Sequence, residues 1–312
     1  MKDVTDMDNI YDIVVIGSGP AGLTAAIYAL RAGKSVMVLE KAAFGGQVTF
    51  SPKIENYPGA GTVSGNELAD KMLDQALSLG ADVNLDAVTG LTVDENGVKT
   101  VIAEDGKYKC RAVIIAVGVK HRLLGVPGEE EMLGEGISFC AVCDGAFYKD
   151  KAVAVIGGGN SALQEAVLLS ETSSHVTVIQ NLDFFTGEAK LVETLEGKDN
   201  VSFVMGTVVK EVLSENGELR GLRLAKAEGG EESVLECDGV FVAIGLVPSN
   251  AIFSELCDLN EWGYFDTDES CVTKTPGVFV AGDCRSKRIR QITTATADGA
   301  VAALAACKYL EN

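Results

Sequence analysis

Residues 11–22 read YDIVVIGSGPAG, a short apolar run followed at once by a glycine-rich turn. Residues that favour a helix then continue to Leu30. Gly17 permits a tight turn, Gly19 lets backbone approach a pyrophosphate, and Gly22 lets the helix pack closely on the strand. The helix N-terminus would face the phosphates. This order of strand, turn and helix predicts a dinucleotide-binding unit, although a glycine pattern by itself is weak.

The strand expected over residues 35–40 strengthens this interpretation because it ends in a carboxylate. Glu40 stands 18 residues after Gly22, close to the distance at which an acid holds the ribose hydroxyls of a dinucleotide. The alternative is a chance glycine-rich turn. It explains neither the strand before the turn nor the acid after it.

The same pattern occurs again at residues 152–162, AVAVIGGGNSA. The second strand of this unit is expected at 176–179, and QNLD follows at 180–183. A ribose-binding acid is missing from the strand end, and so is an arginine for a 2′-phosphate. The sequence therefore predicts a second nucleotide-type unit without the residues that usually read the nucleotide.

Two cysteines lie between the units in the sequence CAVCD at 140–144. Thiols at this spacing support reversible thiol–disulfide exchange, and Asp144 adds a proton donor. The alternatives are half a zinc site or two unrelated buried thiols. Zinc needs four ligands, and the sequence offers only His121, His175 and no second Cys-x-x-Cys. The pattern predicts a redox-active pair of Cys140 and Cys143, and no metal site.

Composition limits the partners. A chain of 312 residues with 47% hydrophobic content allows two cores. A net charge of −19 argues against nucleic acid and anionic lipid as partners. The sequence has no apolar run long enough for a membrane span, and residues 1–10 do not resemble a secretion signal. We therefore expect a cytoplasmic protein without a membrane partner, whose other six cysteines are small buried hydrophobes.

The remaining elements follow from periodicity and turn residues. We expect glycine-rich loops at 44–47 and 54–59, a turn at 246–248, and a strand ending in Gly-Asp at 277–283. Helices are expected at 66–79 and 296–309, a β-meander at 82–113, and further strands at 113–117, 201–203, 219–225 and 240–244.

Together these motifs closely resemble the low-molecular-weight thioredoxin reductases over nearly the whole chain. The matching segments are the cysteine motif between two glycine turns, GGQ at 45–47, ENYPG at 55–59, AGD at 281–283 and RQ at 290–291. The resemblance implies an α/β homodimer with two Rossmann-like, three-layer ββα nucleotide-binding domains per chain. The FAD domain would be discontinuous, at 1–118 and 249–312. The domain at 119–248 would carry the cysteines.

The resemblance also implies a function, a flavoprotein disulfide reductase that reduces thioredoxin. Cys143 would face the flavin, Cys140 would attack the substrate disulfide, and Asp144 would supply the proton. Glu40 would lie on the adenosine side of FAD and Asp283 on its ribityl chain, with Gln47 and Asn56 near the flavin. The implied FAD-binding residues are Gly17, Gly19, Pro20, Ala21, Gly22, Glu40, Gly46, Gln47, Asn56, Gly282, Asp283, Arg290 and Gln291.

The sequence departs from the family pattern at the nicotinamide nucleotide. NADPH-dependent members carry His-Arg-Arg-x-x-x-Arg after the second strand of the middle domain, and residues 180–186 here read QNLDFFT. All three arginines are missing, and each charge-assisted contact contributes roughly 1.5 to 3 kcal/mol. Gln180 and Asn181 are also poor replacements for the acid that would hold NADH. The sequence thus resembles the ferredoxin-dependent flavin thioredoxin reductases.

Other functions remain open. The chain could use NADPH or NADH, or it could be a small-molecule dithiol oxidase of the same fold, or a flavin-binding redox sensor without enzymatic activity. Oxygen consumption with a dithiol would identify an oxidase. Failure of the reduced protein to reduce any disulfide would favour a sensor.

A basic segment is relevant to the identity of the electron donor. Residues 285–290, RSKRIR, hold four of the 26 basic residues, directly after Asp283, and a second basic run lies at 120–122. In one interpretation Arg290 packs near the flavin and the others form a solvated loop. In the other, Arg285, Lys287 and Arg288 form a docking patch for acidic ferredoxin.

Overall fold

The computed structural model describes residues 10–51, 53–230 and 232–311, and these form two compact units. The first unit contains the described residues up to Thr49, Tyr57–Lys120 and those from Val247 onward. The second contains His121–Leu246 and also Phe50–Asn56, which the sequence assigns to the FAD domain. The domain limits expected from the sequence stay a prediction.

The first unit is built on a seven-stranded sheet in the order β3-β2-β1-β6-β5-β4, with β17 also paired to β6. Its strands are β1 Ile10–Ile16, β2 Val36–Glu40, β3 Asp82–Leu85, β4 Val88–Val93, β5 Lys99–Ala103, β6 Lys107–Ile115 and β17 Val278–Val280. Its helices are α1 Pro20–Arg31, α2 Gly65–Ser78 and α6 Ile292–Glu311, with the short 3-10 helices η1 Gly46–Phe50, η4 Ala251–Phe253 and η5 Gly282–Cys284.

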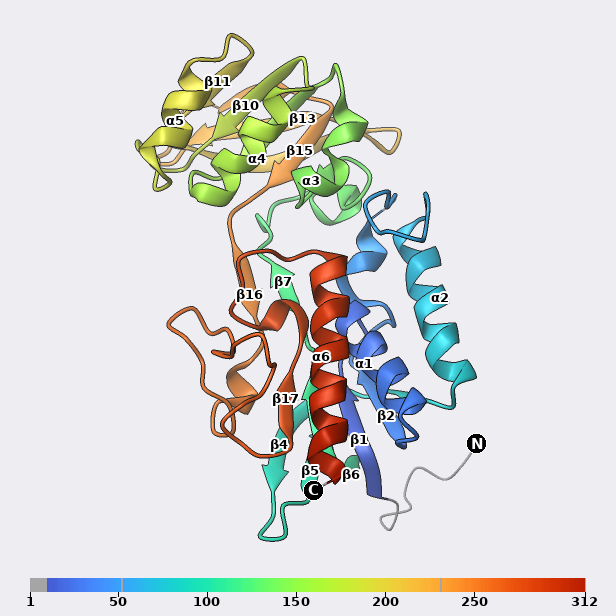
Figure 1. Cartoon of the computed structure of the whole chain (residues 1–312). Coiled ribbons are helices and arrows are strands. Elements are labelled where there is room, and N and C mark those ends of the chain that lie inside the picture. The colour runs from blue at the N-terminus through green and yellow to red at the C-terminus, as the bar shows by residue number, and fades with distance from the viewer. Residues whose placement is uncertain (1–9, 52, 231, 312) are drawn as a thin grey trace. The chain divides into compact units, whose positions relative to one another are not determined.

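The central parallel strand β1 is buried on both faces of the sheet, as parallel strands are. Ile13 and Val15 pack against α1 and α6, whereas Val14 and Ile16 face the opposite core, and none of the four is more than 3% exposed. Burial of one such side chain contributes roughly 1.5 to 3 kcal/mol. Figure 1 shows α6 beside α1 over the sheet. Because β1 and β17 both run parallel to β6, the turns that follow them lie at the same sheet edge.

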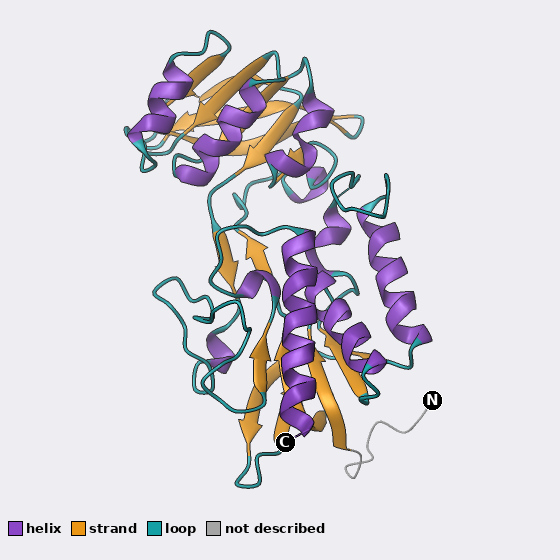
Figure 2. Ribbon diagram, in the orientation of Figure 1, coloured by secondary structure: helices purple, strands orange, loops and turns teal. Residues whose placement is uncertain are grey.

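The second unit has a parallel sheet in the order β11-β10-β9-β15-β8 and an antiparallel sheet β12-β13-β14 (Figure 2). Its strands are β8 Ile137–Ser138, β9 Ala152–Ile156, β10 His175–Ile179, β11 Val201–Val204, β12 Thr207–Glu215, β13 Glu218–Lys226, β14 Glu232–Glu236 and β15 Gly239–Val242. Its helices are α3 Ala141–Asp144, α4 Asn160–Ser170 and α5 Ala189–Glu196, with η2 Glu130–Met132 and η3 Gly145–Tyr148. The predicted α/β class with two Rossmann-like domains is confirmed.

Four details differ from the sequence prediction. Only β4, β5 and β6 form the meander, because β3 pairs in parallel with β2. The strand expected at 113–117 is the end of β6. Residues 246–248 form a strand, β16 Leu246–Pro248, paired with β7 Val119–His121, where the sequence predicts a turn. Helix α6 begins at Ile292, earlier than predicted, since its first turn is too polar to show apolar periodicity.

None of the helices within residues 10–51, 53–230 and 232–311 is long and apolar enough to cross a bilayer. The same residues contain no group of three or more His, Cys, Asp or Glu that could hold a metal ion. Residues 1–9, on which the expectation of no secretion signal partly rests, lie outside the described residues.

Candidate functional site

The glycine turn after β1 has room for a phosphate at one glycine only. Gly17 has φ +105°, and a Cβ there would lie 2.3 Å from the carbonyl oxygen of Ala116. A Cβ on Gly22 would lie 1.9 Å from the Gly17 carbonyl oxygen. A Cβ on Gly19 would meet nothing nearer than the Gly45 oxygen at 3.8 Å. Gly17 and Gly22 therefore serve packing, while the backbone at Gly19 stays open, as close approach of a pyrophosphate requires.

Glu40 is fixed beside this turn. It ends β2 and is only 9% exposed. Its Oε2 accepts hydrogen bonds from Ser18 N at 3.0 Å and Ser18 Oγ at 2.9 Å, and its Oε1 accepts one from Lys41 N at 2.9 Å. Pro20 is the first residue of α1, where a missing N–H costs no hydrogen bond, and Ala21 is buried behind it.

The Gly-Asp turn after β17 meets the start of α1. Gly282 has φ +82°, and a Cβ there would lie 2.8 Å from Ala21 Cβ. The next residue, Asp283, is partly buried, and its Oδ1 atom is fully buried with no hydrogen-bond partner among the described residues. Burial raises the pKa of Asp283 to about 6. A buried oxygen without a donor fits a ligand hydroxyl such as those of a ribityl chain, so the turns at the two ends of the chain fit FAD.

Two further predicted residues complete this edge of the first unit. Arg290 Nε donates to the Asp283 carbonyl oxygen at 3.2 Å, and the guanidinium lies 4.4 Å from the centre of the Tyr264 ring. Gln291 directly precedes α6, and its carbonyl oxygen accepts the Ala295 N–H at 2.9 Å. Arg290 is thereby held next to the Gly-Asp turn, and Gln291 is held at the start of α6.

The remaining predicted residues, Gly46, Gln47 and Asn56, lie in or after the glycine-rich loop that follows β2. A Cβ on Gly46 would lie 3.2 Å from Gly19 Cα, so Gly46 lies against the phosphate turn. Gln47 is exposed on η1 in the same unit. Asn56 belongs to the second unit and is exposed.

In the second unit, Cys140 and Cys143 form a disulfide, with Cα atoms 5.3 Å apart. Helix α3 places them one turn apart, and Cys143 N donates to the carbonyl oxygen of Cys140 at 3.1 Å. Both cysteines are partly exposed, and Val142 between them is 64% exposed. A partly exposed disulfide closed within one turn suits reversible exchange.

Ser138, which the sequence did not indicate, orders this site. Its hydroxyl donates to Asp144 Oδ2 at 2.6 Å and accepts the Cys140 N–H at 3.1 Å. Burial raises the pKa of Asp144, and the hydrogen bond from Ser138 opposes this only in part. Ser138 thus links the acid to the first cysteine. The only feature of the sequence that could have indicated this role is the position of the serine, two residues before the Cys-x-x-Cys motif.

The second glycine turn is covered by residues of its own unit. The Gly158 carbonyl oxygen accepts the N–H groups of Thr186 at 2.9 Å and Gly187 at 3.0 Å. Gln180 is 5% exposed, and a Cβ on Gly158 would lie 2.3 Å from Gln180 Nε2. That amide in turn donates to the Phe184 carbonyl oxygen at 3.2 Å. The position where a ribose acid would stand is therefore held by a neutral side chain that is turned inward.

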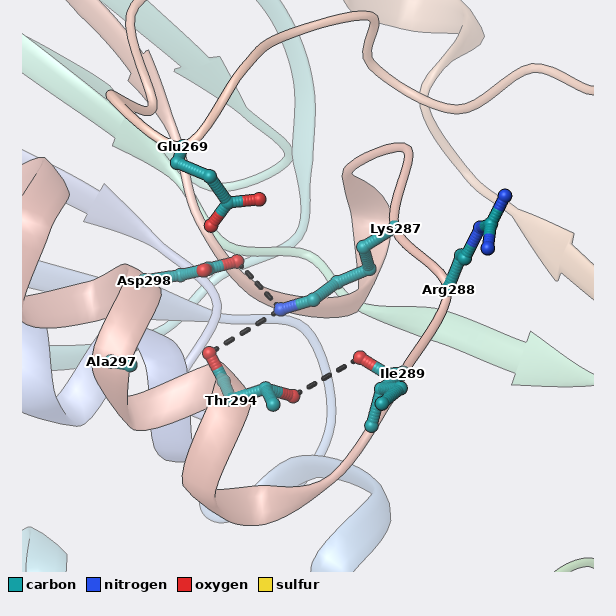
Figure 3. A pocket seen from close by; sticks show the side chains of 7 residues that line it. All are labelled: Glu269, Lys287, Arg288, Ile289, Thr294, Ala297 and Asp298. Carbon is teal, nitrogen blue, oxygen red and sulfur yellow. Dashed lines mark hydrogen bonds and ion pairs between the residues drawn. The ribbon is translucent and has the colours of Figure 1, made fainter.

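The prediction that Arg285, Lys287 and Arg288 form a docking patch is wrong. The alternative, a solvated loop, is also wrong for Arg285 and Lys287. Arg285 is 1% exposed, and its Nε and Nη2 donate to Asp298 at 3.0 and 3.1 Å. The Lys287 side chain is 8% exposed, with Nζ 2.8 Å from Asp298 Oδ2. Figure 3 shows Lys287 turned to Asp298 in a pocket of about 350 Å³, and Arg288 pointing away. Of the three, only Arg288 is exposed.

The charges are buried because α6 supplies Asp298, which lies 13 residues after Arg285 in the sequence. Asp298 Oδ2 also accepts the Gly282 N–H at 2.9 Å, so the same carboxylate holds the Gly-Asp turn. Burial opposes ionisation, but hydrogen bonds from Arg285 and Lys287 lower the pKa of Asp298. The charge spacing in the sequence carried no sign of this distant partner.

We expect Asp298→Asn to lower the free energy of unfolding by about 3 to 5 kcal/mol, because two buried cations lose their counter-charge. Urea denaturation measures the change. The control is Asp258→Asn, which breaks a pair with Lys274 whose side chains are 63% and 43% exposed, and a loss of at most about 1 kcal/mol is expected. Equal losses in the two variants would contradict a buried charge cluster.

The second basic run also carries less charge than its sequence indicates. The ring of His121 stacks on Phe139, with centroids 4.4 Å apart. Burial lowers the pKa of His121 to about 4, so the side chain is neutral near pH 7. Its aromatic contact lies next to Cys140 in the chain. His121 therefore supports the cysteine segment and does not contribute to a basic surface.

Comparisons with known proteins agree with this arrangement. A model of the pyridine nucleotide-disulphide oxidoreductase family matches residues 11–299. A thioredoxin reductase of Bacillus subtilis is 42% identical over 305 residues, covering 98% of this chain and 96% of the relative. A 34.2 kDa protein in a rubredoxin operon of Clostridium pasteurianum is 41% identical, covering 96% and 97%. The crystal structure of thioredoxin reductase from Streptococcus pyogenes has a TM-score of 0.92 at 39% identity, covering 97% and 98%.

Proposed function

This chain belongs to the pyridine nucleotide-disulphide oxidoreductase family, and on that basis we propose that it reduces thioredoxin with electrons from reduced ferredoxin rather than NADPH. The proposal has two parts, the disulfide reduced and the electron donor. The active form is proposed to be a cytoplasmic homodimer, as the resemblance implies.

The first part rests on the Cys140–Cys143 disulfide beside Asp144. Thioredoxin reductases are FAD-binding flavoproteins, and FAD is the cofactor of this disulfide reductase. FAD, when bound, accepts electrons from a donor and delivers a pair to a disulfide. Gly19, Glu40 and Asp283 are the residues that would hold it in the first unit.

In the second unit, the dithiol acts on the substrate. Cys140 attacks a substrate disulfide and forms a mixed disulfide, and Cys143 then displaces the substrate sulfur. Asp144, hydrogen-bonded to Ser138, protonates the leaving thiolate. Its raised pKa keeps the proton available at a higher pH than an ordinary aspartate would.

The observation that carries the donor part is the second glycine turn. Gln180 is packed inward against Gly158, and the family's arginine positions hold Asn181, Leu182 and Thr186, all exposed and uncharged. These three positions therefore offer no cation to a 2′-phosphate. This supports a donor that binds elsewhere and delivers electrons directly to the flavin, as a one-electron iron–sulfur protein can.

The comparisons bear on the donor only indirectly. The names of the Bacillus subtilis and Streptococcus pyogenes relatives state the reductase and not the donor. The Clostridium pasteurianum relative is described only by its place in a rubredoxin operon. The decisive experiment is anaerobic titration of the flavin spectrum with NADPH, NADH and reduced ferredoxin in parallel.

We expect Asp144→Asn to slow thioredoxin reduction by about 100-fold, because the amide cannot supply the proton. The assay is single-turnover reduction of thioredoxin by enzyme that has been chemically pre-reduced, so that the donor plays no part. The matched control is Asp150→Asn, an exposed residue just after the same segment. A normal rate in Asp144→Asn would remove Asp144 from the mechanism.

A further inference from the structure

The hydroxyl group of Ser138 joins the proton donor to the first cysteine in a fixed direction. Ser138 is 6% exposed and ends β8, two residues before Cys140. Its Oγ accepts the Cys140 N–H at 3.1 Å and donates to Asp144 Oδ2 at 2.6 Å. A hydroxyl has only one proton to donate, and a backbone N–H cannot accept it. The Ser138 proton is therefore directed to Asp144.

The two carboxyl oxygens of Asp144 have different surroundings. Oδ2 accepts the Ser138 hydrogen bond, whereas Oδ1 is buried and has no hydrogen-bond partner within the described part of the chain. A carboxylic acid accepts hydrogen bonds mainly through its carbonyl oxygen, so a protonated Asp144 carries its proton on Oδ1. Among the described residues Ser138 is also the only donor to this carboxyl group. It is thus the one group that stabilises the charge on Asp144 after the proton has left.

We propose that Ser138 is a positioning residue for thioredoxin reduction, whose hydroxyl keeps the transferable proton of Asp144 on Oδ1 and stabilises the carboxylate that remains after the transfer. This inference rests on the proposed disulfide reductase function and deepens it. Ser138 is a positioning residue because it acts through Asp144 and transfers no proton to the substrate itself.

Protons and electrons balance over one turnover. The reduced centre begins with Cys140 as a thiolate, one proton on Cys143 and one on Asp144. Cys140 attacks the substrate disulfide, and Cys143 then closes the bond to Cys140, so the cysteine pair gives up two electrons. One departing substrate sulfur takes the proton of Cys143, and the other takes the Oδ1 proton of Asp144. Two substrate thiols are formed, and Asp144 ends as a carboxylate hydrogen-bonded to Ser138.

The groups around Asp144 stay the same when Ser138 is replaced. Helix α3 packs on η3 and α4, whose titratable side chains are Tyr148 and Glu165, and neither is a cation. The hydrogen bond from Ser138 lowers the pKa of Asp144 against the effect of burial. Loss of a hydrogen bond to the charged form should therefore raise the pKa of Asp144 by about 1 to 2 units.

The position of the proton is measured by infrared spectroscopy of the oxidised, FAD-loaded proteins. Subtracting the spectrum of Asp144→Asn, made in each background, isolates the carbonyl band of protonated Asp144, and its loss with rising pH gives the pKa. In the wild type this carbonyl oxygen is Oδ2, which accepts the Ser138 hydrogen bond. Ser138→Ala should move the band to higher wavenumber and its titration upward by about 1 to 2 pH units.

Further variants separate the hydroxyl from the shape of the side chain. Ser138→Thr keeps the hydroxyl and should leave the band and its titration close to those of the wild type. Ser138→Val has the shape of Ser138→Thr without the hydroxyl, and it should match Ser138→Ala. The control is Ser170→Ala, which removes a hydroxyl that is 7% exposed and donates to the Val167 carbonyl oxygen within α4. It should change neither quantity.

Single-turnover reduction of thioredoxin by pre-reduced enzyme gives a second readout. At low pH Asp144 is protonated in both proteins, and the weaker acid of Ser138→Ala gives up its proton more slowly. At high pH the same variant keeps a larger fraction of Asp144 protonated. The rate of Ser138→Ala divided by the wild-type rate should therefore rise by about 10-fold between pH 5 and pH 9. A merely structural defect would lower the rate equally at every pH.

An unchanged carbonyl band together with parallel pH profiles would overturn this inference, and so would equal effects in Ser138→Thr. If Ser138→Ala does not fold, Ser138→Val decides the same question. Pre-reduced wild-type enzyme that fails to reduce thioredoxin would overturn the proposed function. The infrared result would be independent of that failure, because it is obtained with the closed disulfide and needs no substrate.

Discussion

Replacement of Cys140 by serine should lower the rate of thioredoxin reduction by more than about 10³-fold, because a hydroxyl cannot attack a disulfide at neutral pH as a thiolate does. The rate is measured with pre-reduced enzyme under anaerobic conditions, which separates this step from the donor. Cys140 is partly exposed and opens α3, so the substitution leaves the core untouched. The loss is therefore chemical and should not be accompanied by unfolding.

The matched control is Cys237→Ser. Cys237 is 7% exposed, and burial raises its pKa to about 12, so its thiol is inert. Cys143→Ser is the complementary variant, because Cys140 then attacks but cannot be released, and a mixed disulfide with thioredoxin should accumulate. A Cys140→Ser enzyme with the wild-type rate would show that another sulfur attacks the substrate.

Reduced ferredoxin should reduce the bound FAD at least about 10³-fold faster than NADPH at equal concentration. Three missing guanidinium contacts, at roughly 1.5 to 3 kcal/mol each, correspond to a loss of binding of this order or more. Stopped-flow absorbance of the flavin under anaerobic conditions measures both rates. Rapid reduction of the wild-type flavin by NADPH would contradict the donor proposal and leave the cysteine chemistry unaffected.

The same idea can be tested by restoring the cations. Asn181, Leu182 and Thr186 are exposed, so their replacement by arginine should not disturb the core, and it should raise the rate with NADPH by at least about 10-fold. The control places three arginines elsewhere on the second unit, at exposed Thr194, Ser233 and Val234. A gain of equal size in the control would reflect net charge and not a phosphate contact.

Much of the fold was predictable because its signals are local. A strand that runs into a glycine at positive φ and then into a helix is specified by a few neighbouring residues, and both turns lie where the sequence predicts them. Strand β1 begins one residue before the apolar run at 11–16, and α1 ends one residue after the predicted Leu30, although it begins at Pro20, inside the glycine motif. Strand pairing was less predictable, because the alternation in β3 is equally compatible with pairing to β4 or to β2.

The sequence did not predict contacts between residues that only the folded chain brings together. Ser138 and Asp144 are six positions apart, but nothing in their spacing indicated a hydrogen bond. Arg285 and Lys287 looked like a basic surface because four of six neighbouring residues are cationic. Their burial depends on where α6 places Asp298.

The sequence alone therefore determined the two glycine turns, the cysteine pair and the missing arginines, since each depends on residues within a few positions of one another. Backbone conformation, disulfide closure within one helical turn and the absence of a cation are all properties of a short segment. Only the tertiary structure decided which charges are buried and what they pair with. Desolvation and pairing depend on elements that meet from distant parts of the chain, as α6 meets the Gly-Asp turn and α4 meets the cysteine segment.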